Sequence, residues 1–448
     1  MKAYVKTFGC QMNEHDSERM RGLLLKAGYT LAFDEEEADF ILINTCSIRE
    51  KAEQKAFSYL GRLGLCKNKR HTLRIGVCGC IAQREGRRII RRAPYVDLIF
   101  GTKNIHRLPY LIEKMERTQH RVIEIYDDDS ARWQQFGCEI RRDSQISAWV
   151  TIMQGCDNYC TYCVVPYVRG KEWSRQPEEI TGEIGELARL GYKEVTLLGH
   201  NVNSYGRGLS RDFDFPRLIR SIDKIAGIER IRFTTSHPKD FSEELVDAIA
   251  DCPKVCEHIH LPFQSGSDKI LHSMNRKYTT AEYLHKVKML RSRVPKAGIT
   301  SDVIVGFPGE EEEDFQQTLQ LIESVQFEGL FTFLYSVRPQ TEAGNFPHQI
   351  PNNIKQKRFE ILLDIQNRIT SERNRELVET EQEVLVEEAD PQGDKKSGES
   401  PREGILLRGR TRLNKMVKFI GTADRIGKLQ RVKIEKANRF DLEGVIIP

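Results

Sequence analysis

Long apolar runs are missing from this 448-residue sequence, and no stretch approaches the ~18 to 20 apolar residues that span a bilayer. A membrane span is therefore excluded. The N-terminal segment MKAYVKTFGCQMNEHDSER also lacks the apolar stretch of a secretory signal and does not look like a transit peptide. We therefore expect a cytoplasmic protein with no membrane partner. Its formal net charge of +4 is too small to indicate any other partner.

Two familiar binding motifs are missing as well. The segment VGFPGE, residues 305–310, lacks the G-x-G-x-x-G spacing of a dinucleotide-binding loop. No second C-x-x-C pair lies near the cysteines at 156, 160 and 163, although structural zinc sites typically combine two such pairs. The 11 cysteines of a chain in a reducing compartment indicate metal binding or redox chemistry rather than a disulfide framework.

The chain is too long for a single ordinary core, and its patterning divides it into four segments. Short apolar runs alternate with helical patterns in two series, and repeated strand–helix units indicate parallel sheets. We expect an N-terminal α/β domain over 1–120, a connector over 121–141, a central α/β domain over 142–375 and a C-terminal domain over 376–442.

The N-terminal strand candidates are residues 4–8, 40–44, 73–77 and 96–100, and helices are expected from about Asp16, Arg49 and Gln83, with a last helix to about Arg117. The central strand candidates are residues 148–154, 194–199, 231–236, 258–263, 300–306 and 330–336. Six strands separated by helices predict a partial (β/α)6 barrel, whose chemistry is expected at the carboxyl ends of the strands. The overall class is therefore α/β.

The C-terminal segment changes in character. Between residues 404 and 440, eleven Lys and Arg residues stand against two acidic residues, and the β-like runs MVKFIG and LQRVKI lie among them. This composition predicts a small, basic, all-β domain.

Cys156, Cys160 and Cys163 form a C-x-x-x-C-x-x-C run directly after a strand candidate. Cysteine thiolates hold iron-sulfur clusters, and three ligands for a cube of four irons leave one iron open. Zinc is the main rival, but the fourth ligand that it normally needs is not nearby. The remaining alternative is three buried cysteines that lie together by chance.

A second set, Cys10, Cys46 and Cys80, is widely spaced, yet each member follows a successive strand candidate. The carboxyl ends of neighbouring parallel strands meet at one edge of a sheet, so these three thiolates can converge. Cys78 lies two residues before Cys80 and is an alternative ligand in its place. The other cysteines lack a partner set and are interpreted as structural: Cys66, Cys138, Cys252 and Cys256.

Over essentially its whole length the chain resembles the methylthiotransferase family of radical S-adenosylmethionine enzymes. The pattern C-x-x-x-C-x-aromatic-C after the first barrel strand looks like that superfamily. The similarity continues in TFGCQMNEHDSERM, NTCSIREKAEQK, GCIAQREG, LLGHNVNSY, TTSHP, HLPFQSGSD and VGFPGE. FGCQMNEHDSE and NTCSIREKAE look like the branch that modifies isopentenylated adenosine in tRNA.

The resemblance implies a transferase that adds a methylthio group to carbon 2 of N6-isopentenyladenosine at position 37 of tRNA. It implies two 4Fe-4S clusters and two S-adenosylmethionine molecules per turnover, one to methylate sulfur and one to generate the 5′-deoxyadenosyl radical. Cys156, Cys160 and Cys163 would hold the radical-generating cluster, and Cys10, Cys46 and Cys80 an auxiliary cluster that binds sulfur. Further partners would be a sulfur donor and an electron donor such as flavodoxin or ferredoxin.

The candidate contacts to S-adenosylmethionine are residues near strand ends and one aromatic residue: Tyr162, Gly199, Asn201, Ser236, Gln264, Ser265 and Asp302. His200 and His237 could be ligands or proton donors, but a lone histidine near a strand end is more often a hydrogen-bonded structural residue. At His200 the family pattern favours Gln.

The basic C-terminal domain resembles the TRAM domain, a small RNA-binding β-barrel. Phosphate contacts are expected from its basic residues, and basic residues just after the cysteine loop are expected to meet the anticodon stem. The candidates are Arg408, Arg410, Arg412, Lys415 and Lys418 in the domain, and Arg169 and Arg175 after the loop. The alternatives are a solvated basic face for the first group and intramolecular ion pairs with Glu172 or Glu178 for the second.

Two other functions compete with this interpretation. One is the same chemistry on another tRNA adenosine or on an aspartate of a ribosomal protein. The other is a noncatalytic RNA-binding protein with structural zinc.

Overall fold

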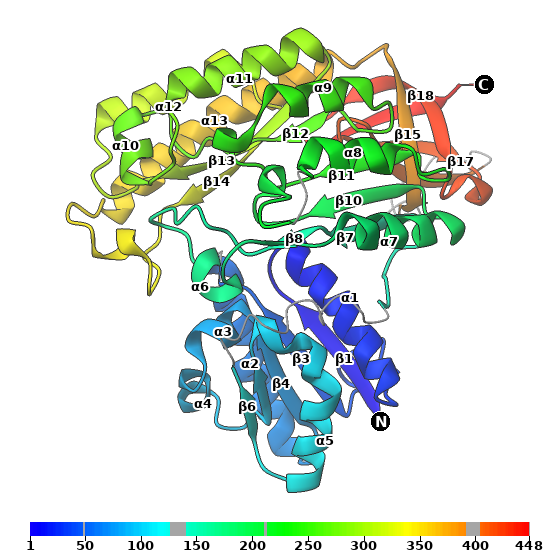
Figure 1. Cartoon of the computed structure of the whole chain (residues 1–448), viewed down its shortest axis with the longest axis vertical. Coiled ribbons are helices and arrows are strands. Elements are labelled where there is room, and N and C mark those ends of the chain that lie inside the picture. Colours follow the sequence, from blue (N-terminus) through cyan, green and yellow to red (C-terminus); the bar gives the residue numbers. More distant parts are fainter. Residues whose placement is uncertain (48–49, 126–139, 210–212, 391–403, 448) are drawn as a thin grey trace, which may run out of the picture.

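The computed structural model describes residues 1–47, 50–125, 140–209, 213–390 and 404–447, which form three domains (Figure 1). In the N-terminal domain a six-stranded parallel sheet has the order β2-β1-β3-β4-β5-β6. Its strands are β1 (Lys2–Thr7), β2 (Thr30–Leu31), β3 (Phe40–Thr45), β4 (Arg74–Gly79), β5 (Leu98–Phe100) and β6 (Val122–Glu124). Its helices are α1 (Gln11–Lys26), α2 (Glu50–Lys69), α3 (Cys80–Glu85), α4 (Arg88–Arg92) and α5 (Leu108–Thr118).

Helices cover both faces of this sheet. α1 and α5 pack on one face against residues such as Phe40 and Leu42, and α2, α3 and α4 pack on the other against Ile41 and Ile43. The central strand FILINT is therefore buried at every position, as expected for a parallel strand between two helical layers.

The four strands predicted for this domain are present, whereas β2 and β6 were not predicted. The largest difference concerns α1, which begins at Gln11 and not near Asp16. The polar run QMNEHDSER looks unlike a buried helix, yet Asn13, His15, Asp16 and Arg19 are all buried. The first three contact residues of the central domain. Cys10 is consequently the N-cap residue of α1.

The central domain contains two three-stranded parallel sheets, with the orders β11-β10-β7 and β12-β13-β14. Isolated parallel β-bridges extend them at Ile231–Val255 and at Gln264–Val303. Its strands are β7 (Ser147–Thr151), β10 (Glu194–Leu198), β11 (Arg230–Phe233), β12 (His258–His260), β13 (Gly298–Val305) and β14 (Gly329–Leu334). These are the six predicted strands in the predicted order, so the α/β class and the partial barrel are confirmed.

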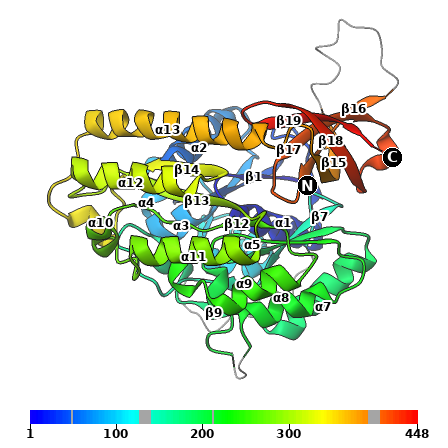
Figure 2. The same cartoon turned by 90° about the horizontal axis from the view of Figure 1, so that it is seen from above.

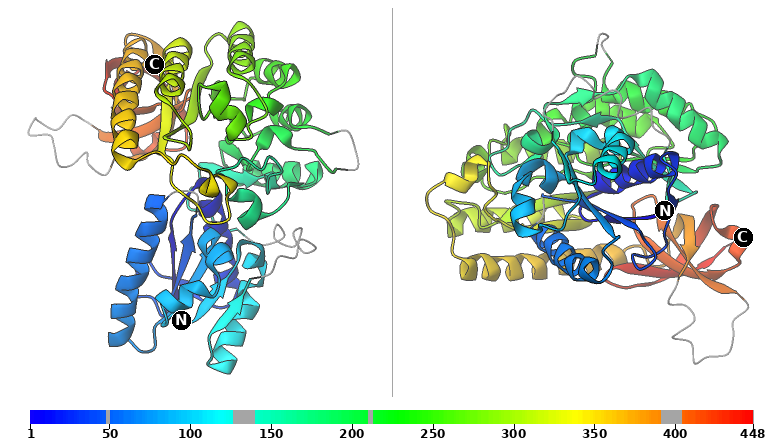
Figure 3. Two further views of the ribbon diagram at one scale, coloured as in Figure 1. Left: turned by 90° about the vertical axis from the view of Figure 1, so that its left-hand side faces the viewer. Right: turned by 90° about the horizontal axis from the view of Figure 1, so that it is seen from below.

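The helices of the central domain lie on the outer side of these strands (Figure 2). They are α7 (Pro177–Arg189), α8 (Phe215–Asp223), α9 (Glu243–Asp251), α10 (Asp268–Ser273), α11 (Thr280–Arg293), α12 (Glu312–Val325) and α13 (Asn352–Arg375). Their apolar faces and the strands share one continuous core. The N-terminal domain lies across the opposite, inner side, as the side and bottom views show (Figure 3).

The C-terminal domain is a closed barrel with the order β15-β16-β17-β19-β18. Its strands are β15 (Glu381–Ala389), β16 (Ile405–Thr411), β17 (Met416–Gly421), β18 (Leu429–Ala437) and β19 (Asp441–Ile446). The all-β prediction is confirmed, and β19 carries the barrel beyond residue 442. Among the described residues, no helix is long and apolar enough to cross a bilayer.

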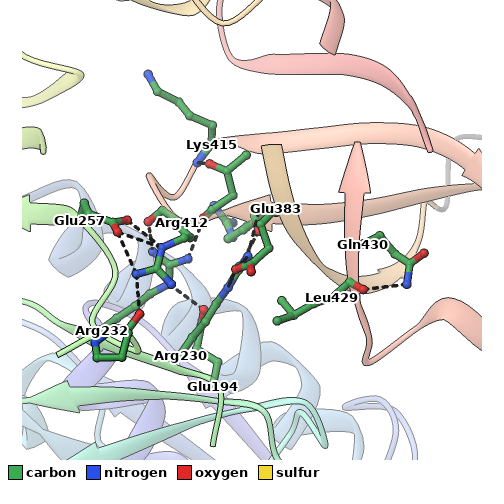
Figure 4. A network of polar contacts seen from close by, with 12 residues as sticks. Glu194, Arg230, Arg232, Glu257, Glu383, Arg412, Lys415, Leu429 and Gln430 are labelled. Atoms are coloured by element: carbon green, nitrogen blue, oxygen red, sulfur yellow. Dashed lines mark hydrogen bonds and ion pairs between the residues drawn. The ribbon is translucent and has the colours of Figure 1, made fainter. Parts of the chain in front are cut away.

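Arginine side chains dock this barrel onto the central domain (Figure 4). Arg230, whose side chain is fully buried, bonds the Glu383 carboxylate at 2.8 Å and the Arg410 carbonyl at 2.7 Å. Arg232 donates to the carbonyls of Thr411 and Arg412 at the end of β16, and it pairs with Glu194 at 2.8 Å. From the barrel side, Arg412 pairs with Glu257 at 2.8 Å. The barrel is therefore fixed through backbone carbonyls as well as through ion pairs.

We expect Arg230→Met to lower the free energy of unfolding by on the order of 2 kcal/mol, because it leaves Glu383 and a barrel carbonyl without their buried partner. Denaturant unfolding measures this change. Arg431→Met is the matched control, since it removes an exposed ion pair with Glu381 on the barrel alone and should cost less than about 1 kcal/mol. Equal losses in the two variants would contradict the docking role of Arg230.

Candidate active site at the contact of the N-terminal and central domains

The loop with Cys156, Cys160 and Cys163 runs from the short strand β8 (Met153–Gln154) to helix α6 (Val165–Arg169). Its two ends are tied together, because the Cys156 N–H donates to the Gly170 carbonyl at 3.2 Å. Its middle is tied to the end of α10, where the Thr161 hydroxyl donates to the Ser273 carbonyl at 2.9 Å. The loop is thus held in place independently of any bound group.

The three thiols of this loop lie in a buried environment and influence one another. Burial raises the pKa of Cys156 to about 11, and the neighbouring Cys160 adds to the shift. Burial, with Cys160 and Cys156 nearby, raises the pKa of Cys163 to about 12. The Cys156 and Cys163 thiols are therefore costly to ionise unless a cation neutralises them, which is what iron would do.

Sequence reasoning missed Arg276, which lies against this loop. Its guanidinium is buried and contacts the Cys160 Sγ at 3.5 Å and the Tyr162 hydroxyl at 3.5 Å. It is held there by the Pro262 carbonyl at 2.8 Å and by Tyr278. No local motif marks this arginine, because it lies 116 residues from Cys160 in the sequence.

The N-terminal cysteines are also brought to one edge of their sheet. Thr45 pairs with Gly79, so Cys46 and Cys80 emerge side by side, and Thr7 pairs with Asn44 on the other flank. A side chain at Gly9 would lie 2.9 Å from the Cys46 Sγ, so glycine allows the Cys10 loop to approach. Cys46 and Cys80 are buried, and Cys10 is partly exposed.

The electrostatics favour a thiolate at Cys10. The Cys46 thiol, Arg169 and the backbone N–H groups at the start of α1 lower the pKa of Cys10 to about 6, against the effect of burial. A helix N-terminus stabilises a thiolate in this way. Burial raises the pKa of Cys80, and Arg169 opposes that shift.

The loops with Cys10, Cys46 and Cys80 thus lie at one edge of the N-terminal sheet. Within the described ranges, no group of three or more Cys, His, Asp or Glu side chains is already closed around a metal position. Cys78 faces away from the site: its Sγ lies 3.4 Å from the Ile43 carbonyl and 3.5 Å from the Met20 Sδ in the core beneath α1.

Of the cysteines interpreted as structural, Cys252 lies in the central core and Cys66 packs against the N-terminal core. Cys256 is buried near Arg232. Cys138 lies outside the described residues.

Helix α6 joins the two cysteine sets. Val164, which follows Cys163, and Val168 pack directly against Cys80. The Val168 carbonyl accepts a 2.6 Å hydrogen bond from Thr102. Arg169, at the end of α6, forms a 2.7 Å ion pair with Asp16 of α1, and both side chains are almost fully buried. The radical-type loop and the N-terminal cysteines therefore share one packed contact.

Buried polar atoms without partners mark the carboxyl ends of three central strands. Among the described residues, no hydrogen bond reaches the Asn201 Oδ1 after β10, the Ser236 Oγ and His237 Nε2 after β11, or the Gln264 Oε1 after β12. Buried polar atoms are normally satisfied, so this group indicates a place for a polar ligand. The donors and acceptors fit the polar groups of S-adenosylmethionine.

The other candidate cofactor contacts have different surroundings. Gly199 packs against Met153, and Ser265 accepts a hydrogen bond from the Ser267 N–H. Asp302 lies within β13, with its carboxylate 3.5 Å from His260 Nε2. The Tyr162 ring packs beside a separate apolar group that contains Phe307.

Burial lowers the pKa of His200 to about 3, and it also lowers the pKa of His237. Both imidazoles are therefore neutral at physiological pH, which suits hydrogen bonding rather than proton donation.

The two arginines proposed as RNA contacts after the loop are buried. Arg169 is directed to Asp16, and Arg175 forms a 2.7 Å ion pair with Glu183. The structure thus favours the alternative of intramolecular ion pairs, with other carboxylates than the nearby Glu172 and Glu178.

All five RNA candidates of the barrel form ion pairs. Arg408 pairs with Glu388, Arg410 with Glu387, and Lys418 with Asp390 and Asp441, all within the barrel. The other two reach the central domain: Arg412 pairs with Glu257, and Lys415 with Glu328 at 2.7 Å. The first three remain partly exposed, so they are the better placed to meet a phosphate.

Family models match all three domains. Residues 2–101 match the uncharacterized protein family UPF0004, residues 150–322 the radical SAM superfamily, and residues 375–447 the TRAM domain.

Curated relatives match the whole chain. A protein of Pelotomaculum thermopropionicum is 48% identical over 100% of this chain and 98% of its own length, and one of Alkaliphilus oremlandii is 47% identical over 100% and 93%. Both are named tRNA-2-methylthio-N(6)-dimethylallyladenosine synthase. The chain belongs to this synthase family. It is therefore a radical S-adenosylmethionine transferase, and the sequence interpretation of its family is confirmed.

Solved structures show the fold of this family in more distant proteins. The radical S-adenosylmethionine methyltransferase TsrM from Kitasatospora setae aligns with a TM-score of 0.57 at 14% identity, over 77% of each chain. The S-adenosylmethionine radical enzyme OxsB aligns at 0.53 and 12% identity, over 82% of this chain and 56% of that one. A radical S-adenosylmethionine enzyme binds a 4Fe-4S cluster and S-adenosylmethionine, and the residues described above are chemically suited to both.

We expect Asp16→Asn to lower the free energy of unfolding by about 3 kcal/mol, because it leaves the Arg169 guanidinium buried without its counter-charge. Asp143→Asn is the matched control. It removes another Asp–Arg pair with α1, to Arg21, but Asp143 is 61% exposed and the cost should stay below about 1 kcal/mol. Denaturant unfolding of both variants tests this difference, and similar costs would show that the buried pair holds nothing in place.

Proposed function

We propose that the chain transfers a methylthio group to carbon 2 of N6-isopentenyladenosine at position 37 of tRNA. In this proposal Cys156, Cys160 and Cys163 hold one 4Fe-4S cluster and the N-terminal cysteines hold a second. Two S-adenosylmethionine molecules are consumed per turnover, and the reaction takes place in the cytoplasm. The observation that carries the proposal is that Cys80 packs against Val164 and Val168, which follow the Cys156–Cys163 loop directly, in a chain of this family.

Cys156, Cys160 and Cys163 would hold a cluster that supplies the electron for cleavage of S-adenosylmethionine, and Cys10, Cys46 and Cys80 would hold one that binds the sulfur to be transferred. The rest of the site is the work of the chain. Arg276 sets a buried positive charge beside Cys160, where the cluster ligands are negative. The Asn201, Ser236 and Gln264 side chains offer polar atoms to a ligand at the strand ends. The packed interface limits the access of water to a reactive radical.

The proposed substrate class is supported by the chemistry of the target bond as well as by the family. Carbon 2 of adenine carries a nonacidic C–H bond, for which acid–base groups offer little. The neutral His200 and His237 are in keeping with this, since neither is placed to act as a charged acid. The barrel supplies partly exposed basic residues for a tRNA backbone, with Arg408, Arg410 and Lys418 as the proposed contacts. A sulfur donor and a flavodoxin or ferredoxin type of electron donor complete the proposal.

The division of roles between the cysteine sets gives the main test. After anaerobic reconstitution, the Cys10→Ala/Cys46→Ala/Cys80→Ala variant should still form 5′-deoxyadenosine from S-adenosylmethionine but yield no methylthio product on an isopentenylated anticodon stem-loop. The matched control is Cys78→Ala, since this thiol lies in the core of the same domain. It should keep both activities.

Mass spectrometry of the nucleosides and of 5′-deoxyadenosine measures both outcomes. Loss of cleavage in a correctly folded triple variant contradicts separate roles. Methylthio product from the same variant contradicts an auxiliary cluster at these residues. Absence of product on isopentenylated RNA with the unaltered enzyme contradicts the substrate assignment.

The cofactor contacts give a separate prediction. Gln264→Ala and Ser236→Ala should each weaken S-adenosylmethionine binding by about tenfold, since each removes one hydrogen bond to a polar ligand, worth about 1.4 kcal/mol. Equilibrium dialysis of the reconstituted protein measures the affinity. Gln316→Ala, on the exposed surface of α12, should leave it unchanged. Unaltered binding in the first two variants would exclude them as contacts.

A further inference from the structure

Arg169 occupies an unusual position for an arginine. It lies six residues after Cys163, at the end of α6, and only 4% of its surface is exposed. Its two terminal nitrogens meet the Asp16 carboxylate at 2.7 Å and the Asn13 Oδ1 at 2.9 Å, both on α1. An arginine of the central domain is thus inserted into the N-terminal domain.

Asn13 extends this contact to two of the N-terminal cysteines. Its amide nitrogen donates to the Phe8 carbonyl at 2.9 Å and to the Thr45 carbonyl at 3.0 Å. Phe8 lies two residues before Cys10, and Thr45 directly precedes Cys46. Arg169 therefore fixes the side chain that ties both of these loops together.

The third cysteine is reached directly. Cys80 packs against Val164 and Val168 of the same short segment, and Val168 directly precedes Arg169. In addition, the buried Nε of Arg169 has no hydrogen-bond partner among the described residues. Buried donors without partners are rare. A free hydrogen-bond donor near the cysteine thiols is suited to a bound group that is held by those thiols.

An ion pair for stability alone does not account for these contacts. A single carboxylate would satisfy the charge, and a buried pair gives little net stability over apolar packing. The planar guanidinium instead has donors beyond the one that meets Asp16, and one of them reaches the Asn13 side chain, which ties the Cys10 and Cys46 loops together.

We propose that Arg169 is a positioning residue for an auxiliary cluster, which holds Cys10, Cys46 and Cys80 in ligating positions and ties them to the radical loop through α6. This inference rests on the proposed function, because it needs an iron-sulfur cluster at those three cysteines. It also explains why the sequence places a basic residue shortly after Cys163 and buries it.

The test uses the full chain with Cys156→Ala/Cys160→Ala/Cys163→Ala as the parent, so that any cluster seen is the auxiliary one. After anaerobic reconstitution, this parent should hold about four irons per chain. Arg169→Gln should retain less than half of that iron, because the loops lose their common tie. Arg175→Gln is the matched control: it removes another buried arginine of the same segment, whose partner is Glu183, and should retain the iron of the parent.

Arg169→Lys keeps the charge and guards against a variant that fails to fold. A lysine cannot serve Asp16 and Asn13 with a planar fork, so we expect iron to be retained and the reduction potential of the cluster to change. Potentiometric titration followed by electron paramagnetic resonance measures the potential. Circular dichroism and thermal melting check that the variants fold alike.

The outcomes distinguish a failure of the proposed second cluster from a failure of the proposed role of Arg169. A parent that holds no iron-sulfur cluster overturns the second cluster of the proposed function, and this inference with it. A parent that holds a cluster, with iron content unchanged in Arg169→Gln and the potential unchanged in Arg169→Lys, overturns the role of Arg169 alone. Loss of iron in Arg175→Gln to the same extent as in Arg169→Gln also overturns it, since any buried arginine would then matter equally.

Discussion

The buried contact between α6 and α1 decides how the chain is organised. Arg169 and Asp16 meet there with almost no exposure to water, and Val164 and Val168 pack on Cys80 beside them. A buried charge is tolerated only where its partner is fixed, so the two domains have little freedom to shift across this contact. The unusual polarity of α1, with its buried Asn, His, Asp and Arg residues, follows from the same constraint. In sequence α1 looks like a surface helix, but it forms the buried contact for Arg169, which follows the cysteine loop.

A second use of arginine fixes the barrel at the other side of the central domain. Arg230 and Arg232 of β11 donate to backbone carbonyls of the barrel. In the other direction, Arg412 at the end of β16 forms an ion pair with Glu257 of the central domain. Backbone carbonyls cannot change their place without a change in the fold, so these bonds define the orientation of the barrel more strictly than pairs of flexible side chains would. Several basic residues of this chain thus serve contacts between its own domains.

The sequence was informative where one residue pattern determines one local outcome. Apolar runs predicted ten strands of the two α/β domains, and the rule that parallel strands end at one edge placed the loops of Cys10, Cys46 and Cys80 at the same edge of the sheet. It failed where the outcome depends on partners far away. The start of α1 was missed because its polar residues are buried by another domain, and Arg276 because it reaches Cys160 from 116 residues away. The burial of Arg169 and Arg175 was open for the same reason: the positions of their carboxylates, Asp16 and Glu183, depend on the tertiary fold.

The spacing of the two cysteine sets has a consequence for the order in which the protein matures. Cys156, Cys160 and Cys163 lie within eight consecutive residues, so a flexible chain can gather them around iron before much else has formed. Cys10, Cys46 and Cys80 are each delivered by a different strand, and they become neighbours only when β1, β3 and β4 have paired. Any metal bound at this second set must therefore arrive after the N-terminal sheet is complete, and Cys10, the most accessible of the three, has to stay reduced until then.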